Sequence, residues 1–296
     1  MVSGNRLHVS AAILLVVALA LLVSLSGCAI GKAISTPLPA KNIERWVNPL
    51  DSYVPMKSVA SDYAEVLLNA KCMTAAGYDW QVPWRDLKGD NGPSWNSVDR
   101  RLFNVSLASK YGYHDGPPER SSTNPEWEAF AHKKISPAED AALTRCIEHD
   151  RKRLPTLDGA TANLAMGYIG AAIDNAIQDG GVVTAMKKWK ACMTPVGIVD
   201  LPDSPLRMPT ESIRTRFGID LSESASTGTA SAEEITIAVA DAACQDSSGF
   251  SKAFYNAEWD ASVVLYKENA DALAVARKAI EEHDAAVQAI IDANMP

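Results

Sequence analysis

The sequence lacks the short motifs that reveal many enzymes. It contains no Gly-x-Ser-x-Gly, no His-Glu-x-x-His, no glycine-rich phosphate loop and no dinucleotide fingerprint. Cys-x-x-Cys is also missing, so a zinc site of the finger type is disfavoured. We therefore predict no cofactor and no bound metal, and we favour a protein without catalytic activity over an enzyme.

Basic residues are scarce and scattered. The chain has 28 Lys and Arg against 36 Asp and Glu, a formal net charge of −8. The longest basic run is Arg151-Lys152-Arg153, which is typical of a helix end. An acidic surface without a larger basic cluster is poorly suited to nucleic acid or to anionic lipid. We predict no nucleic-acid partner.

The N-terminal region has no charge between residues 11 and 23. Residues 1–8 before it carry one arginine and no acid, which is typical of a signal peptide. The alternative, a permanent transmembrane helix, needs roughly 20 apolar residues. The run instead ends at Leu25-Ser26-Gly27-Cys28, which resembles the bacterial lipobox. That resemblance implies that a signal peptide, residues 1–27, is removed and that Cys28 receives a diacylglycerol.

Lipid on Cys28 would hold the protein on the extracytoplasmic face of the cell membrane. Two acyl chains anchor a protein firmly, because each buried CH₂ contributes ~0.8 kcal/mol. Membrane lipid is therefore the first expected partner. Residues 28–46 contain Ser, Thr, Pro and Lys with little periodicity, and we predict that they form a membrane tether.

The rest of the chain is predicted to be mostly α-helical. Ser136-Pro137 and Ser231-Ala232-Glu233-Glu234 are start signals for two helices, which carry Cys146 and Cys244. The Gly- and Pro-rich stretches 80–124 and 202–230 are predicted to be loops, with at most one short helix at 98–110. Apolar spacing predicts further helices at 59–73, 161–178 and 182–193.

A long C-terminal helix is predicted, since residues 251–293 contain neither Gly nor Pro. A continuous helix of that length would extend about 65 Å at ~1.5 Å per residue. Apolar residues recur on it every seven positions. We expect this ladder to pack on the protein's own helices; the alternative is a partner helix. The ladder consists of Trp259, Tyr266, Leu273, Ile280 and Val287.

Four cysteines remain after Cys28, and an even number in an oxidising compartment indicates two disulfides. A repeat suggests their pairing: Cys-Met-Thr occurs at Cys72 and at Cys192, each near a predicted helix end and each followed by a loop-rich stretch. A second cysteine then follows in a helix. The chain is thus predicted to form two related disulfide-stapled helical units, residues 47–153 and 154–296, with bridges Cys72–Cys146 and Cys192–Cys244.

Several landmarks resemble a group of uncharacterised secreted or lipid-anchored actinobacterial proteins. The resemblance implies the location and the cysteine framework, and it implies no activity. One departure is Gly180-Gly181, at a place where that group would have a turn more compatible with a helix. The landmarks are Pro49-Leu50-Asp51-Ser52-Tyr53, the two Cys-Met-x-x-x-Gly repeats, Tyr111-Gly112-Tyr113, Trp189-x-x-Cys192-Met193 and Val239-Ala240-Asp241-Ala242-Ala243-Cys244.

One loop-rich region is unusually aromatic and is our candidate ligand-binding surface. Aromatic faces can stack on sugar rings, which would suit a cell-wall glycan. The alternative, which we favour, is that these rings anchor loops that lack regular structure. The residues are Trp80, Trp84, Trp95, Tyr111, Tyr113 and Trp127.

Together these patterns indicate a non-enzymatic envelope lipoprotein that binds a wall component or another envelope protein. The alternative is a cell-wall hydrolase whose acidic residues come from distant segments. A deep cleft lined by two carboxylates of raised pKa would favour the hydrolase. A shallow aromatic surface would favour binding.

Overall fold

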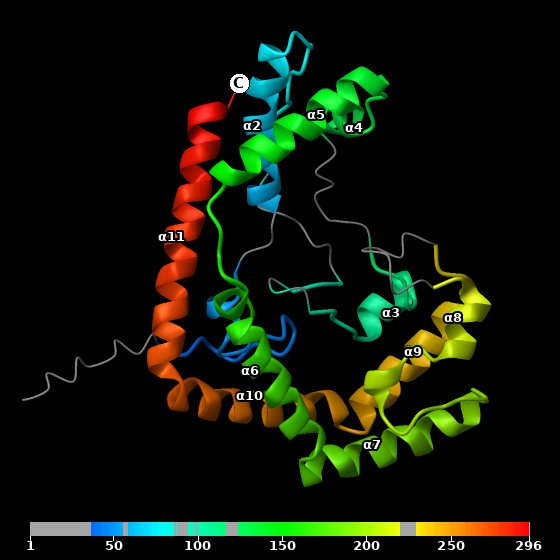
Figure 1. Ribbon diagram of the computed structural model, residues 1–296. Helices are drawn as coiled ribbons and strands as arrows, with labels where there is room; N and C mark the ends of the chain where they lie inside the picture. Colours follow the sequence, from blue (N-terminus) through cyan, green and yellow to red (C-terminus); the bar gives the residue numbers. More distant parts are fainter. Residues whose placement is uncertain are drawn as a thin grey trace, which may run out of the picture. The chain divides into compact units, whose positions relative to one another are not determined.

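The described part of the chain is built from α-helices. The computed structural model describes residues 37–55, 59–85, 87, 94–96, 98, 100–116, 124–219 and 229–295, and in these ranges the one β pairing is an isolated bridge between Trp95 and Arg101. The mostly α prediction is confirmed (Figure 1). The α-helices are α2 (Val59–Ala75), α3 (Val105–Tyr111), α4 (Pro125–Ala131), α5 (Pro137–Asp150), α6 (Gly159–Ile177), α7 (Gly180–Met193), α8 (Glu211–Phe217), α9 (Ala232–Ser247), α10 (Phe250–Glu268) and α11 (Ala270–Asn294).

The N-terminal predictions concern residues outside these ranges. The signal peptide, Cys28 and the first part of the tether all fall within residues 1–36. In the described ranges, no helix combines the length and the apolar character needed to cross a bilayer.

Both predicted start signals cap their helices. Ser136 forms a capping box at α5, since its side chain accepts from the Glu139 backbone N–H and the Glu139 carboxylate accepts from the Ser136 N–H. Ser231 caps α9 through the Glu234 backbone N–H. The Glu234 side chain turns away to another partner, as described below. Gly180-Gly181 starts α7, because Asp179 caps the first turn.

Two expectations about the loops were wrong in detail, and one further short helix, α4, was not predicted. The short helix expected at 98–110 begins only at Val105, because Asn104 caps it by accepting from the Leu107 N–H. The stretch 202–230 contains α8, which Thr210 caps. α4 follows its own cap, Asn124. These helices are seven residues long, too short for an apolar periodicity to stand out.

The long C-terminal helix is interrupted at Asn269, which separates α10 from α11. The Asn269 side chain donates to the Leu265 carbonyl and accepts from the Tyr168 hydroxyl of α6. Because of the interruption, the two parts of the seven-residue ladder pack on different helices. α10 packs against α6, and α11 packs against α2 and α6 (Figure 1). All five ladder residues are buried within the chain, so the ladder packs on the protein's own helices.

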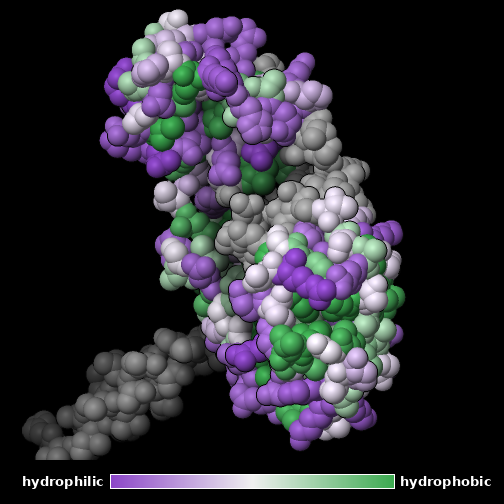
Figure 2. Space-filling view, turned by 90° about the vertical axis from the view of Figure 1, so that its right-hand side faces the viewer, coloured by the Kyte–Doolittle hydropathy of each residue, from purple (hydrophilic) through white to green (hydrophobic). Residues whose placement is uncertain are grey.

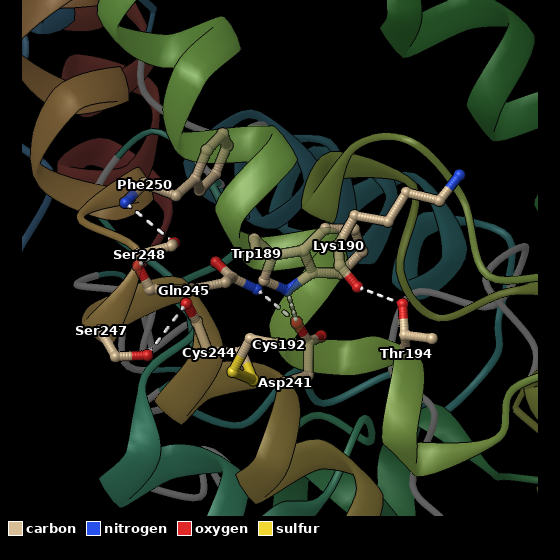
Figure 3. Close-up of a disulfide and its surroundings, with 10 residues drawn as sticks. All are labelled: Trp189, Lys190, Cys192, Thr194, Asp241, Cys244, Gln245, Ser247, Ser248 and Phe250. Atoms are coloured by element: carbon tan, nitrogen blue, oxygen red, sulfur yellow. Dashed lines mark hydrogen bonds between the residues drawn. A yellow bond between two sulfur atoms is a disulfide. The ribbon is translucent and has the colours of Figure 1, made fainter.

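Each disulfide lies in its own apolar cluster, and both predicted pairings are confirmed. Cys72–Cys146 joins α2 to α5, beside Val287 and Ile291 of α11. Cys192–Cys244 joins the last turn of α7 to α9, next to buried Trp189 (Figure 3). α3 packs against α9. Helices from each predicted half therefore contact helices of the other half.

The segment that leads into the folded part is itself attached to α10. The Asn42 backbone N–H donates to the Tyr255 hydroxyl, which in turn donates to the Val47 carbonyl. Lys41 donates to the Asn256 side chain. The last residues of the predicted tether thus reach the helix that lines the candidate site.

Candidate functional site

A cavity of about 430 Å³ is bordered by the 100–113 segment, by the 205–208 segment and by α9 and α10. This volume lies within the range of small-molecule sites, roughly 300 to 1,000 Å³. Most of its lining is apolar and aromatic. The main lining side chains are Trp46, Phe103, Tyr113, Leu206, Phe250 and Phe254.

A fully buried carboxylate, Asp241 of α9, stands at the wall of this cavity. It accepts hydrogen bonds from Tyr113 Oη at 3.1 Å, Trp189 Nε1 at 2.8 Å and Gln245 Nε2 at 3.0 Å. Figure 3 shows Trp189 and Gln245 directed at Asp241 beside the Cys192–Cys244 bridge. Burial raises the pKa of Asp241, and the three donors oppose that shift. The carboxylate therefore connects the loop at Tyr113, α7 and α9 through hydrogen bonds.

Tyr113 is held in place from two sides. Its phenol is buried, which raises its pKa, and the neighbouring Asp241 charge raises it further. Its backbone N–H donates to Glu234 Oε1 at 2.7 Å, and His114 Nδ1 lies 2.9 Å from the same oxygen. Gly112 permits this approach, because it has φ +60° and a Cβ there would lie 2.4 Å from Glu234 Oε1.

Two arginines border the cavity, and each is paired with an acid. Arg100 Nη1 donates to Glu258 Oε2 at 2.6 Å, and Glu258 is only 1% exposed. Arg101 donates from Nε to Asp115 at 3.2 Å and from Nη2 to the Tyr113 carbonyl. The charged groups that line the cavity, these two arginines and Asp241, thus all have protein partners.

Trp46 has the only positive φ, +48°, of any non-glycine residue among those described. This left-handed conformation is uncommon for a bulky residue and persists only where the surroundings impose it. Here Trp46 Nε1 donates to Glu258 Oε2 at 2.9 Å, and the ring meets Tyr255 edge-on at 5.2 Å. The Arg100 guanidinium lies 5.5 Å above the ring. Trp46 is therefore held rigidly at the cavity wall.

A second cavity of about 310 Å³ adjoins the first, since Trp46, Phe103 and Ser251 line both. Its remaining lining is more polar and includes Glu44, Asn104, Ser106 and Asp246.

The structure separates the six aromatic residues of the candidate ligand-binding surface. Trp80 and Trp127 both contact Phe130, in the cluster around the first disulfide. Tyr113 lines the 430 Å³ cavity, in a different cluster. Trp95 and Tyr111 are half-buried. Trp84 is 55% exposed, whereas Trp80 is 9% exposed.

Sequence reasoning missed Trp46, Phe103 and Asp241 as cavity residues. A signal existed for Trp46, because a large ring in an otherwise polar segment is expected to find an apolar partner. Asp241 lies in a landmark stretch, but among its three donors only Gln245, one turn later on the same helix, is near it in sequence. Tyr113 and Trp189 are brought to it by a loop and by α7.

Apolar side chains also reach the surface near this site. Figure 2 faces the side on which α7, α8 and α9 lie in Figure 1, and apolar side chains gather in its lower part. Exposed apolar residues after α7 include Val196, Val199 and Leu206.

No known protein family, curated protein or solved structure matches the chain. Within the described ranges, no three His, Cys, Asp or Glu side chains gather in a way that could hold a metal ion.

Proposed function

We propose that the protein is a lipid-anchored envelope protein that binds a small, mainly apolar molecule without transforming it. The observation that carries this proposal is the 430 Å³ cavity, whose walls are largely aromatic and whose charged groups are already paired within the protein. The proposed location at the membrane follows from the N-terminal pattern that ends at Cys28.

The arrangement of carboxylates supports binding over hydrolysis. Acid–base hydrolysis needs two carboxyl groups at the reacting bond, with one able to exchange a proton. Among the described residues that line the 430 Å³ cavity, Asp241 is the only carboxylate, and three donors hold it. The two acids of the adjoining cavity, Glu44 and Asp246, are exposed to water. Asp51, with a pKa raised to about 6 by burial, does not line the cavity.

Filling the cavity tests the proposal. Leu206 lines it and is 44% exposed, so an indole can be accommodated there at little cost to the core. We expect Leu206→Trp to weaken the binding of N-phenylnaphthylamine, an uncharged fluorescent probe, at least tenfold, about 1.4 kcal/mol. The measurement is a fluorescence titration of the folded protein.

Val199→Trp is the matched control. Val199 is 91% exposed in the same region and does not line the cavity, so this variant adds the same indole elsewhere. Its probe affinity should equal that of the wild type. Equal affinity in all three proteins, or no probe binding by the wild type, would refute the proposal.

A further inference from the structure

We infer that the two adjoining cavities form one site for a neutral amphiphile with an apolar tail and a hydroxylated head, the chemistry of an alkyl glycoside. This inference rests on the proposed binding function and specifies its ligand class. The 430 Å³ cavity, hereafter the inner chamber, would take the tail. The 310 Å³ cavity, hereafter the outer chamber, would take the head.

The two chambers share a rigid aromatic rim. Trp46 and Phe103 line both chambers and are half-buried, so part of each ring can be reached from outside. Phe103 stacks on Tyr113 with ring centroids 5.5 Å apart and an interplanar angle of 5°. Trp46 is fixed through Glu258 and Tyr255. A molecule that occupies both chambers must lie across these rings, which suits the flat apolar face of a sugar.

The chambers differ in chemistry. The inner chamber offers mainly aromatic and aliphatic surface. The outer chamber also has apolar lining, but it adds carboxylate, amide and hydroxyl groups from Glu44, Asn104, Ser106 and Asp246, none of which lines the inner chamber. Glu44 and Asp246 are exposed, so their oxygens can accept hydrogen bonds from ligand hydroxyls. Hydrogen bonds to a carboxylate are stronger than those between neutral groups.

The charges around the rim favour a neutral head. Glu44 and Asp246 would repel an anionic head such as a carboxylate or a phosphate. A cationic head would usually bind over an aromatic face. Both rim rings, however, already carry a guanidinium, Arg100 at 5.5 Å from the Trp46 centroid and Arg101 at 5.9 Å from the Phe103 centroid. A cationic head would be attracted to Glu44 and Asp246 but would also meet these two guanidiniums, whereas a hydroxylated head is repelled by neither set of charges.

The test compares ligands that share an octyl tail. Octyl glucoside, octanol, octanoate and octyltrimethylammonium are titrated calorimetrically below their micelle-forming concentrations. We expect the full chain to bind octyl glucoside about tenfold more tightly than octanol, as a few net hydrogen bonds to the head would give. Both charged ligands should bind more weakly than the glucoside.

Removing the outer acids should abolish this preference. In Glu44→Ala/Asp246→Ala, octyl glucoside should bind no more than about twofold more tightly than octanol. The control Glu148→Ala/Asp174→Ala removes two exposed acids outside both chambers, and it should keep the preference.

The outcomes separate the two proposals. If octanol binds as tightly as octyl glucoside, or if a charged ligand binds most tightly, the inferred head chemistry is wrong while the binding function stands. The same holds if N-phenylnaphthylamine binds but none of the octyl ligands does. If neither the fluorescent probe nor any octyl ligand binds, both proposals are refuted.

Discussion

At the residue scale, the half-buried acid Asp51 makes the stability of the fold depend on pH. Partial burial raises its pKa from 3.8 to about 6 although it accepts from the Asn48 N–H at 2.7 Å. Nearby Arg100 lowers this pKa, and nearby Glu258 raises it. The folded protein therefore binds the Asp51 proton more tightly than the unfolded chain does.

This difference predicts the sign of a pH effect. The stabilising contribution of protonated Asp51 is complete below pH about 4 and is lost as pH rises through about 6. Asp51→Asn keeps an acceptor for the Asn48 N–H and cannot ionise. We expect the wild type to lose about 1 to 2 kcal/mol relative to this variant between pH 4 and pH 7, a figure reduced for solvent screening. Urea unfolding of both proteins at several pH values measures it, and parallel curves would contradict the assignment.

At the element scale, the two disulfides have different neighbours. Cys192–Cys244 holds α7 against α9. Cys244 lies three residues after Asp241, and the Asp241 carboxylate accepts from the Trp189 indole and lines the inner chamber. Cys72–Cys146 holds α2 against α5 in another apolar cluster. The inner chamber should therefore depend on the second bridge and not on the first.

Replacing each bridge by serines tests this dependence. The bridges join residues 74 and 52 positions apart, and chain entropy predicts a loss of roughly 4 kcal/mol for either pair. At matched stability, reached by adjusting temperature, Cys192→Ser/Cys244→Ser should bind N-phenylnaphthylamine more weakly than Cys72→Ser/Cys146→Ser. Equal probe affinities would disprove the local coupling, and non-reducing peptide maps that link Cys72 to Cys192 would disprove the pairing.

At the scale of the whole molecule, the proposed lipid anchor at Cys28 is connected to the candidate cavity through the N-terminal segment. The residues between Cys28 and the hydrogen bond from Asn42 to Tyr255 would connect the lipid to the α10 helix. α10 also supplies Phe250 and Phe254 to the inner chamber. A lipid anchor on Cys28 would thus link the candidate cavity to the membrane through the residues between them.

Cys28→Ala should abolish both metabolic acyl labelling and globomycin-sensitive processing, since the Leu25-Ser26-Gly27-Cys28 pattern places the acylated cysteine there. Ser24→Ala, just outside that pattern, should leave labelling intact. The measurement is incorporation of an alkyne-tagged fatty acid into the expressed protein. Label that persists in Cys28→Ala would rule out the proposed anchor.

Local signals in the sequence determined most of the helices and both disulfide pairings. Capping by Ser136 and Ser231 depends on residues three positions apart, and the cysteine pairing was visible in the repeat at Cys72 and Cys192. Capping acts within one helical turn, and the repeat is found by comparing two segments of the same chain, so a single sequence displays both. The break at Asn269 carries no Gly or Pro, and it became visible only with the Tyr168 contact from α6.

Tertiary structure alone decided the candidate site. Tyr113 meets Asp241 across 128 positions, and Trp46 meets Glu258 across 212. The six aromatic residues chosen from the sequence lie within 48 positions of one another, yet Trp80 and Trp127 belong to one apolar cluster and Tyr113 to another. A buried acid such as Asp241 or Glu258 needs donors from several elements to offset its desolvation. Only the packing of α7, α9, α10 and the loops brings those donors together.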